Sequence, residues 1–287
     1  MKKLLTLVLA VLMIAGCALS FASCGDKTDF ESIEKKGKFV CGITIYAPMN
    51  FYDANGDLIA DETGDLKDLS GFDTELAKLV AEKLGLEVEF QIIEWGQKYA
   101  ELQSGAIDCI WNGFTSNSKD DDGIDRADKV DFTYAYLDNA QCVIVKSDKV
   151  GEFTSAASLA GKKAAAETGS AGESYAKTVT DADKVVGKTS QMDTFAELIS
   201  GAVDFIVVDV LLADKLVGQG NYAGLAKASS ITIDSEVYSI GCRKGSDFDD
   251  KINEALVELL NEGKIEELAA KYNVHVTQSL LDKKTAK

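Results

Sequence analysis

A short polar loop followed by an isolated arginine is the part of this 287-residue chain best suited to hold a small ligand. Asn112, Gly113 and Thr115 follow the apolar run 109–111, and Arg126 follows an acidic stretch. A planar guanidinium can bind a carboxylate through two parallel hydrogen bonds, and the loop can add hydroxyl and backbone N–H groups. Two interpretations of Arg126 stay open: it binds an anionic group of the ligand, or it is an exposed surface charge. The loop either binds ligand or is a simple turn.

A second set of candidate residues lies in the later half of the chain. Gly169, Ser170 and Ala171 form a turn that leads into a predicted helix, and N–H groups at a helix N-terminus favour a negative charge. Asp209 ends the predicted strand 205–208. Its carboxylate could pair with an ammonium group, and it could also cap the following helix, predicted over 210–216.

An internal repeat indicates which elements position these residues. The stretch ELQSGAIDCI at 101–110 recurs as ELISGAVDFI at 197–206. Each copy predicts a helix end, a glycine C-cap and a short buried strand. Strands are predicted over 39–45, 87–93 and 163–167, and helices over 73–84, with Asp73 as N-cap, and from Ser170 onward. This alternation predicts parallel sheets with helices on both faces, arranged as two α/β lobes.

The ligand cleft is expected between the two lobes, because open α/β sheets bind ligands beyond the carboxyl ends of their strands. Segments 141–146 and 236–243 are predicted strands that flank the second lobe, and both are candidate crossings between lobes. Segment 248–272 is predicted to be helical. Its apolar stripe consists of Ile252, Leu256, Leu259, Leu260, Ile265 and Leu268.

The first residues are typical of a secretory signal rather than of folded structure. Lys2 and Lys3 precede an apolar segment at 4–15, which is too short for a confident membrane span. Cys17 and Cys24 each follow small residues, as a lipid-modified cysteine does. Cys24 is favoured because the chain turns polar directly after it. An ordinary cleaved signal is the alternative.

Charge and composition exclude several classes of function. The formal net charge of −17 argues against nucleic-acid binding, because nothing here neutralises phosphates. The single histidine, His275, leaves little for a metal site or histidine catalysis, and no phosphate-binding glycine loop with lysine occurs, so neither metal nor cofactor is expected. Four cysteines lie in apolar runs and read as buried free thiols, although disulfides stay possible in an exported protein: Cys41, Cys109, Cys142 and Cys242.

Several stretches together resemble the extracellular solute-binding proteins, family 3, which serve polar amino acid ABC importers. They are YAPMNF at 46–51, GFDTELAKLVAEKLG at 71–85, LQSGAIDCIWNGFT at 102–115, KVDFTYAY at 129–136, GKKAAAETGSAGE at 161–173, DFIVVD at 204–209 and GCRKGSDF at 241–248. The resemblance implies an α/β type II periplasmic-binding-protein fold with two lobes, two crossings and a central cleft that closes on ligand. It implies a signal peptide at 1–24, a tether at 25–37, lobe 1 at 38–140 and 237–287, and lobe 2 at 141–236.

The resemblance also implies roles for the candidate residues. Arg126 matches the family's arginine that holds the ligand carboxylate, because RADKVDF at 126–132 fits the pattern R-x-x-K-V-D-F. Ten residues, 116–125, separate Thr115 from Arg126, more than the family usually has. Either these residues bulge outward and Arg126 keeps its place, or Arg126 is displaced and Lys119 is a weak substitute.

The remaining contacts follow from the same comparison. Asn112, Gly113 and Thr115 would offer groups from one loop, and the turn of Gly169, Ser170 and Ala171 would bind the same carboxylate. Ala171 stands where a hydroxyl residue is common, so its N–H group is expected to serve. Asp209 would pair with the ligand ammonium group. Tyr46 and Phe51 match the family's aromatic wall over the ligand, with a core role as the alternative.

The sequence therefore predicts a monomeric, lipid-anchored binding protein outside the cytoplasm. It would capture a free amino acid between its lobes and deliver the ligand to the permease subunits of an ABC importer. An enzyme on the same fold, such as a cyclohexadienyl dehydratase, and a ligand-sensing binding protein are the alternatives. The identity of the amino acid does not follow from the sequence.

Overall fold

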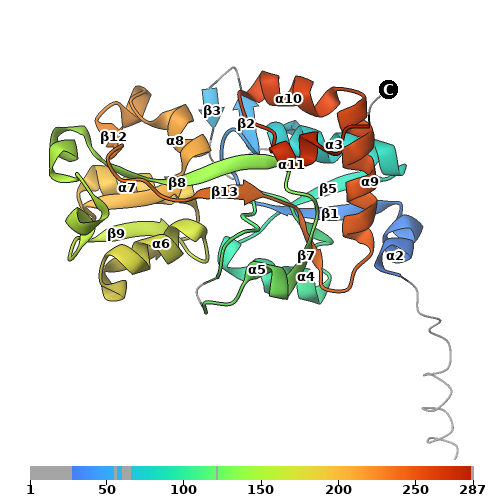
Figure 1. Cartoon of the computed structure of the whole chain (residues 1–287), viewed down its shortest axis with the longest axis horizontal. Coiled ribbons are helices and arrows are strands. Elements are labelled where there is room, and N and C mark those ends of the chain that lie inside the picture. The colour runs from blue at the N-terminus through green and yellow to red at the C-terminus, as the bar shows by residue number, and fades with distance from the viewer. Residues whose placement is uncertain (1–27, 55–56, 60–65, 121, 286–287) are drawn as a thin grey trace, which may run out of the picture.

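Two sheets, one in each of two lobes, organise the computed structural model, which describes residues 28–54, 57–59, 66–120 and 122–285 (Figure 1). In the first lobe the strand order is β5 (Glu87–Ile92), β1 (Lys38–Ile43), β6 (Cys109–Ile110), β14 (Gly241–Arg243) and β7 (Val130–Phe132). In the second lobe it is β10 (Val185–Lys188), β9 (Ala164–Glu167), β11 (Phe205–Asp209), β8 (Leu137–Lys146) and β12 (Leu225–Lys227). The predicted two-lobed α/β class is confirmed.

The prediction of parallel sheets is correct for only part of each sheet. Strands β5, β1 and β6 run parallel, as do β10, β9 and β11. However, β14 runs antiparallel to both of its neighbours, and β8 runs antiparallel to β11 and β12. The antiparallel strands are the segments on which the chain enters or re-enters a lobe, so no crossover helix sets their direction.

The two crossings lie side by side between the lobes. Residues 137–140 of β8 pair with β13 (Ser235–Tyr238), whereas residues 141–145 pair with β11. The predicted crossing strand 236–243 is in fact two strands, β13 and β14, separated by Ser239 and Ile240. A smaller sheet of β3 (Asp57–Ile59), β2 (Phe51–Ala54) and β4 (Leu69–Ser70) belongs to the first lobe.

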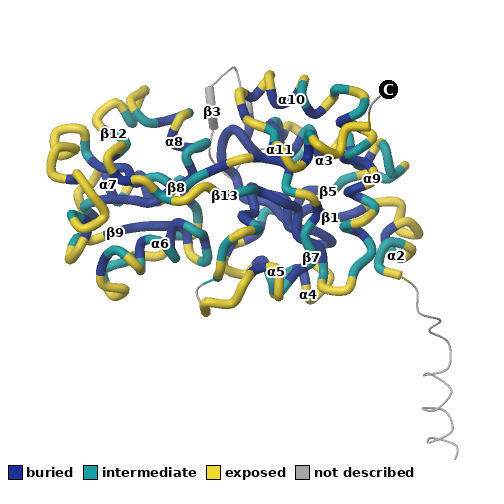
Figure 2. Tube along the Cα trace, viewed as in Figure 1, coloured by how far each residue is buried: buried dark blue, intermediate teal, exposed yellow. Residues whose placement is uncertain are grey.

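The helices cover the sheets, whose strands form the buried centre of each lobe (Figure 2). The first lobe carries α2 (Asp29–Lys36), α3 (Phe72–Leu84), α4 (Lys98–Ser104), α5 (Arg126–Lys129), α9 (Phe248–Asn261), α10 (Lys264–Tyr272) and α11 (Gln278–Leu281). The second carries α6 (Ala171–Val179), α7 (Gln191–Ser200) and α8 (Val210–Leu216). The predicted C-terminal stripe is buried, but the helix breaks at Gly263, where the backbone is left-handed.

The internal repeat has the same structure in both lobes. Gly105 ends α4 and Gly201 ends α7, each in the left-handed conformation predicted for a C-cap. Asp108 then accepts a hydrogen bond from the Val40 N–H at 2.9 Å, and Asp204 accepts one from the Lys163 N–H at 2.9 Å. Each copy therefore ties a helix end to a neighbouring parallel strand, at β1 in the first lobe and just before β9 in the second.

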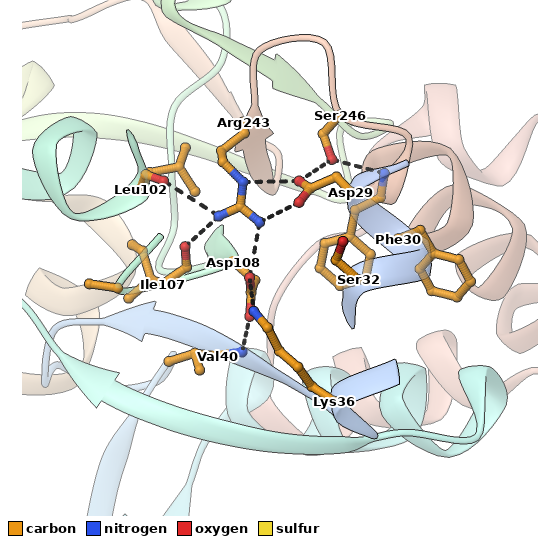
Figure 3. Close-up of polar contacts among 12 residues, drawn as sticks. Asp29, Phe30, Ser32, Lys36, Val40, Leu102, Ile107, Asp108, Arg243 and Ser246 are labelled. Carbon is orange, nitrogen blue, oxygen red and sulfur yellow. Dashed lines mark hydrogen bonds and ion pairs between the residues drawn. The ribbon is translucent and has the colours of Figure 1, made fainter. Parts of the chain in front are cut away.

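In the first lobe Asp108 also belongs to an ion-pair cluster on the side of α2 (Figure 3). Arg243 donates from Nη2 to Asp29 at 2.7 Å and to Asp108 at 2.9 Å, and from Nη1 to the Ile107 carbonyl at 2.8 Å. The Asp29 and Asp108 carboxylates raise the pKa of Arg243 against the opposing effect of burial. The cluster joins α2, β14 and the first repeat copy into one unit.

The remaining sequence predictions concern the signal segment, membrane spans, metal ligands and cysteines. The signal segment, Cys17 and Cys24 lie outside the described residues. Within them, no helix has the length and apolar character needed to cross a bilayer, and no group of three potential metal ligands occurs. The four cysteines that follow the signal segment are free in this structure; all but the half-buried Cys142 are buried.

Candidate ligand-binding site

A small cavity lies where the two lobes meet, at the carboxyl ends of β9 and β11. Its volume is about 20 Å³, and the lobes touch beside it, because Arg126 and Lys98 of the first lobe hydrogen-bond to the Gly169 carbonyl of the second. The first lobe contributes Trp95, Asn112, Gly113, Thr115 and Arg126, and the second contributes Gln141, Glu167, Ser170, Ala171, Gln191 and Asp209. All the predicted residues of the two polar turns except Gly169 line this cavity, together with Arg126 and Asp209.

The loop after β6 is held in position from beneath by Asp73. The Asp73 carboxylate accepts hydrogen bonds from the Gly113 N–H at 3.0 Å and from the Tyr136 hydroxyl at 2.8 Å. Burial raises the pKa of Asp73 to about 7. The predicted N-cap role of Asp73 is wrong, because Gly71 occupies the N-cap position and the Asp73 side chain turns inward to the loop.

Asn112 and Gly113 are fixed by their neighbours as well. The Asn112 side chain accepts a hydrogen bond from Asn50 at 2.6 Å and donates one to the Thr44 hydroxyl. Gly113 has a φ of +60°, and a side chain there would overlap the Tyr46 hydroxyl. The loop geometry therefore requires glycine at this position.

Arg126 is buried in the cavity wall, so its interpretation as an exposed surface charge is wrong. Its exposed fraction is 1%, and its Nη1 and Nη2 atoms donate to the carbonyl oxygens of Thr115 at 3.1 Å and Gly169 at 3.3 Å. The guanidinium lies 5.3 Å from the centre of the Phe114 ring, and its Nε atom has no hydrogen-bond partner. Burial lowers the pKa of Arg126. The guanidinium thus retains an unused donor.

The described residues between Thr115 and Arg126 form a mostly exposed excursion. Lys119 forms an ion pair with Asp125, and Lys129 on α5 forms one with Asp120. The chain returns from this excursion to the cavity, which Arg126 lines. Lys119 is exposed, and it does not line the cavity as a substitute for Arg126.

The turn before α6 presents backbone groups from the second lobe. Ser170 is the N-cap of α6, and its hydroxyl accepts the Glu173 N–H at 3.0 Å, so that oxygen is engaged in capping. The Gly169 carbonyl accepts hydrogen bonds from Arg126 and, at 3.0 Å, from Lys98, both of which belong to the first lobe. These contacts join the lobes across the mouth of the cavity.

Asp209 lies at the N-cap position of α8, but its side chain makes no capping hydrogen bond. Its carboxylate instead accepts from the amides of Asn139 at 2.9 Å, Gln141 at 2.5 Å and Gln191 at 2.5 Å. Burial raises the pKa of Asp209, and the amide donors partly offset this effect. Asp209 therefore occupies the predicted N-cap position, but its side chain does not cap the helix.

Two further acids near the cavity were missed in the sequence analysis. Glu236 on β13 accepts from Gln141 at 2.9 Å and from the Thr115 hydroxyl at 3.2 Å, and burial raises its pKa to about 7. Glu167 ends β9 and is 3% exposed, and burial raises its pKa to about 8. The rule that identified Asp209, a polar residue at a strand's carboxyl end, applies equally to Glu167.

The two aromatic residues predicted to cover the ligand do not line the closed cavity. Tyr46 is buried beneath the loop at Gly113, and burial raises its pKa well above the ordinary value. Phe51 packs edge-on against Tyr272, with ring centres 6.3 Å apart. Trp95, which was not selected from the sequence, does line the cavity.

A buried guanidinium and buried carboxylates that face one cavity between two closing lobes define a binding protein for a small charged ligand. Residues 39–275 match the family described as bacterial extracellular solute-binding proteins, family 3. This match covers most of the chain, and the chain belongs to that family.

Individual relatives agree with this assignment. The L-cystine-binding protein TcyJ of Escherichia coli (strain K12) is 26% identical over 272 residues, which cover 92% of each chain. The solved structure of an ancestral arginine-binding protein bound to arginine is 32% identical, with a TM-score of 0.70 over 82% of this chain and 98% of that chain. The solved ancestral amino acid-binding protein AncCDT-1, described as a precursor of cyclohexadienyl dehydratase, is 28% identical, with a TM-score of 0.69 over 84% and 98%.

Proposed function

We propose that this protein is the substrate-binding component of an ABC importer and captures a free amino acid between its lobes. The observation that carries the proposal is that Arg126 from the first lobe and Asp209 from the second line the same cavity. A free amino acid carries one carboxylate and one ammonium group, and these two side chains supply a partner for each. The ligands named for the relatives, L-cystine and arginine, support this class.

Most of the predicted contacts have a role in this proposal. The ligand carboxylate binds Arg126 and the N-terminal end of α6, where Ser170 and Ala171 line the cavity. The ammonium group binds Asp209. Asn112, Gly113 and Thr115 orient the ligand through the loop that Asp73 supports, and Tyr46 supports that loop from below.

Binding requires the lobes to separate first, because Arg126 and Lys98 of the first lobe hydrogen-bond to the Gly169 carbonyl of the second at the cavity. The hydrogen bonds from Arg126 and Lys98 to the Gly169 carbonyl are the contacts that opening would break. Ligand then favours closure, because it bridges groups from both lobes, and the closed form is the one that the permease subunits receive.

Export, attachment to the membrane and the lobe boundaries are part of the same proposal. A signal peptide at 1–24 directs export, and a lipid on Cys24 tethers the chain to the membrane surface. The predicted tether at 25–37 is too long, because Asp29–Lys36 form α2, which is ion-paired to the first lobe through Asp29 and Arg243. The protein acts as a monomer with lobe 1 at 38–140 and 237–287 and lobe 2 at 141–236. The change of β8 pairing from β13 to β11 after Ala140 supports this boundary.

Thermal melting of the purified protein with each common amino acid tests the proposal. A ligand that binds only the folded state raises the melting temperature, and the rise should be lost in Arg126→Ala. Peptides and organic acids form the control panel, and a rise with these alone would contradict the amino acid assignment.

A dehydratase activity is the second candidate, because protonated carboxyl groups such as Glu167 and Glu236 are what general acid catalysis requires. Incubation with a cyclohexadienyl substrate and chromatography of the products distinguishes it from binding alone. Turnover that Glu167→Gln abolishes would favour the enzyme.

A further inference from the structure

Glu167 lines the cavity, and one of its carboxyl oxygens has no hydrogen-bond partner. Its side chain is 3% exposed and lines the cavity, and its Oε1 atom has no hydrogen-bond partner. A buried acceptor without a donor costs free energy and calls for an explanation. A hydrogen-bond donor on the ligand would give this oxygen a partner.

Asp209 differs from Glu167 in this respect. The two carboxylates end the adjacent parallel strands β9 and β11, so they lie at the same edge of the sheet. Asp209 accepts from three side-chain amides, which hold it in place for an ammonium group. With Arg126 and Asp209 assigned to the ligand's backbone carboxylate and ammonium groups, Glu167 is left for another part of the ligand.

The charges facing Glu167 come from three elements. Asp209 on β11 and Asp193 on α7 raise its pKa, in addition to the larger effect of burial, and Lys98 on α4 lowers it. Lys98 donates to the carbonyl oxygens of Trp95 at 3.1 Å and Gly169 at 3.0 Å, and its ammonium lies 4.8 Å from the centre of the Trp95 ring. The cavity lining itself holds two acids, Glu167 and Asp209, and one cation, Arg126.

A zwitterionic amino acid whose ammonium group binds Asp209 brings no further donor for the Oε1 atom of Glu167, whereas an amino acid with a cationic side chain brings one. We propose that Glu167 accepts the side-chain cation of the ligand and thereby selects amino acids such as lysine, ornithine or arginine. This inference rests on the amino acid function proposed above.

Proton release gives the inference an independent readout. The pKa of Glu167, raised by burial to about 8, leaves its carboxyl group mainly protonated at pH 7. A lysine ammonium group that pairs with Glu167 favours the charged carboxylate, so the carboxyl O–H bond breaks and its proton passes to the buffer. Lysine binding should therefore release about one proton more than binding of norleucine, which lacks the side-chain ammonium group.

Isothermal titration of the purified protein with two matched ligand pairs tests the inference. Lysine is compared with norleucine and arginine with citrulline, because each pair differs mainly in the side-chain charge. We expect the cationic member to bind at least about 30-fold more tightly, since a buried charge pair contributes on that order. Titrations in buffers of different ionisation enthalpy count the released protons.

The decisive variant is Glu167→Gln, which keeps the side-chain volume and removes the charge. It should abolish most of the preference for the cationic ligands and the proton release, while norleucine and citrulline keep their affinities within about threefold. Glu197→Gln is the matched control, because Glu197 lies on α7 in the same lobe, outside the cavity lining, and pairs with Lys188. It should change neither quantity.

Three results would overturn the inference. If Glu167→Gln weakens every amino acid equally, Glu167 serves the α-ammonium group or the contact with Lys98 rather than side-chain selection. If wild type binds lysine and norleucine alike, no cation subsite exists, although the amino acid function stands. If none of the common amino acids binds, the proposed function itself fails and the inference with it.

Discussion

Replacing Arg126 with methionine should separate ligand binding from stability. The change removes a buried guanidinium whose two hydrogen bonds go to carbonyl oxygens and whose Nε atom is unpartnered. Loss of the charged partner of a carboxylate costs about 2–5 kcal/mol of binding free energy. The dissociation constant for the preferred amino acid should therefore rise by between about 30-fold and a few thousand-fold.

Stability without ligand should change much less. The two lost hydrogen bonds from a charged donor stabilise by about 1.5–3 kcal/mol each, but burying the charge costs several kcal/mol, which methionine avoids. These effects nearly cancel, so the free energy of unfolding should stay within about 1 kcal/mol of wild type. For a chain of this size the melting temperature should then shift by no more than about 4 °C.

Titration calorimetry measures the affinity, and urea unfolding without ligand measures the stability. Arg243→Met is the matched control, because Arg243 pairs with Asp29 and Asp108 outside the cavity. It should lower the free energy of unfolding by about 3–5 kcal/mol and leave ligand affinity unchanged. An Arg126→Met protein that binds ligand like wild type but is destabilised by more than about 3 kcal/mol would refute the reasoning.

Three further predictions concern the loop, the cavity mouth and the buried acids. Gly113→Ala should lower the free energy of unfolding by more than about 2 kcal/mol and abolish binding, whereas Gly105→Ala, also at positive φ but in open space, should cost only about 1 kcal/mol in urea unfolding. Gly96→Val should weaken binding in calorimetry without destabilising the unliganded protein, because a Cβ atom there already meets Thr168 of the other lobe at 3.3 Å. The contribution of Glu167 to the free energy of unfolding should fall as the pH rises from about 4 to about 8. Burial raises the pKa of Glu167 in the folded protein to about 8, whereas in the unfolded chain the carboxyl group titrates at about 4. Glu167→Gln should remove that fall in urea titrations across this range.

Each of these predictions has a contradicting result. Equal losses in the two alanine variants would mean that backbone conformation alone, rather than contact with Tyr46, sets the cost at Gly113. Unchanged affinity in Gly96→Val would mean that the closed mouth is not part of the bound state. A wild-type stability curve that matches Glu167→Gln at every pH would place the Glu167 carboxyl group in contact with water.

Local patterns predicted the elements well. Glycine after an amphipathic stretch fixed the ends of α4 and α7, and apolar runs located β1, β9 and β11 within about two residues. The repeat predicted matching units in the two lobes, and both copies use their aspartate in the same hydrogen bond. These features depend on residues close in sequence, which is why the sequence alone was sufficient.

The errors arose where contacts join distant segments. Asp73 follows the start of a helix and was assigned as its N-cap, but its carboxylate binds the loop at Gly113, far along the chain. Position in a helix does not reveal such a partner. The antiparallel directions of β8 and β14 likewise follow from the path between lobes and not from their residues.

The sequence by itself determined the α/β elements, the two-lobed class and most of the polar residues that gather at the cavity, because strand ends and helix starts carry local signals. Tertiary structure decided which of these residues share the cavity and in what electrostatic state. Arg126 is buried among the Phe114 ring and the carbonyl oxygens of Thr115 and Gly169, and burial raises the pKa of Glu167 to about 8. Burial and pairing depend on the packing of both lobes, and no short stretch of sequence contains that information.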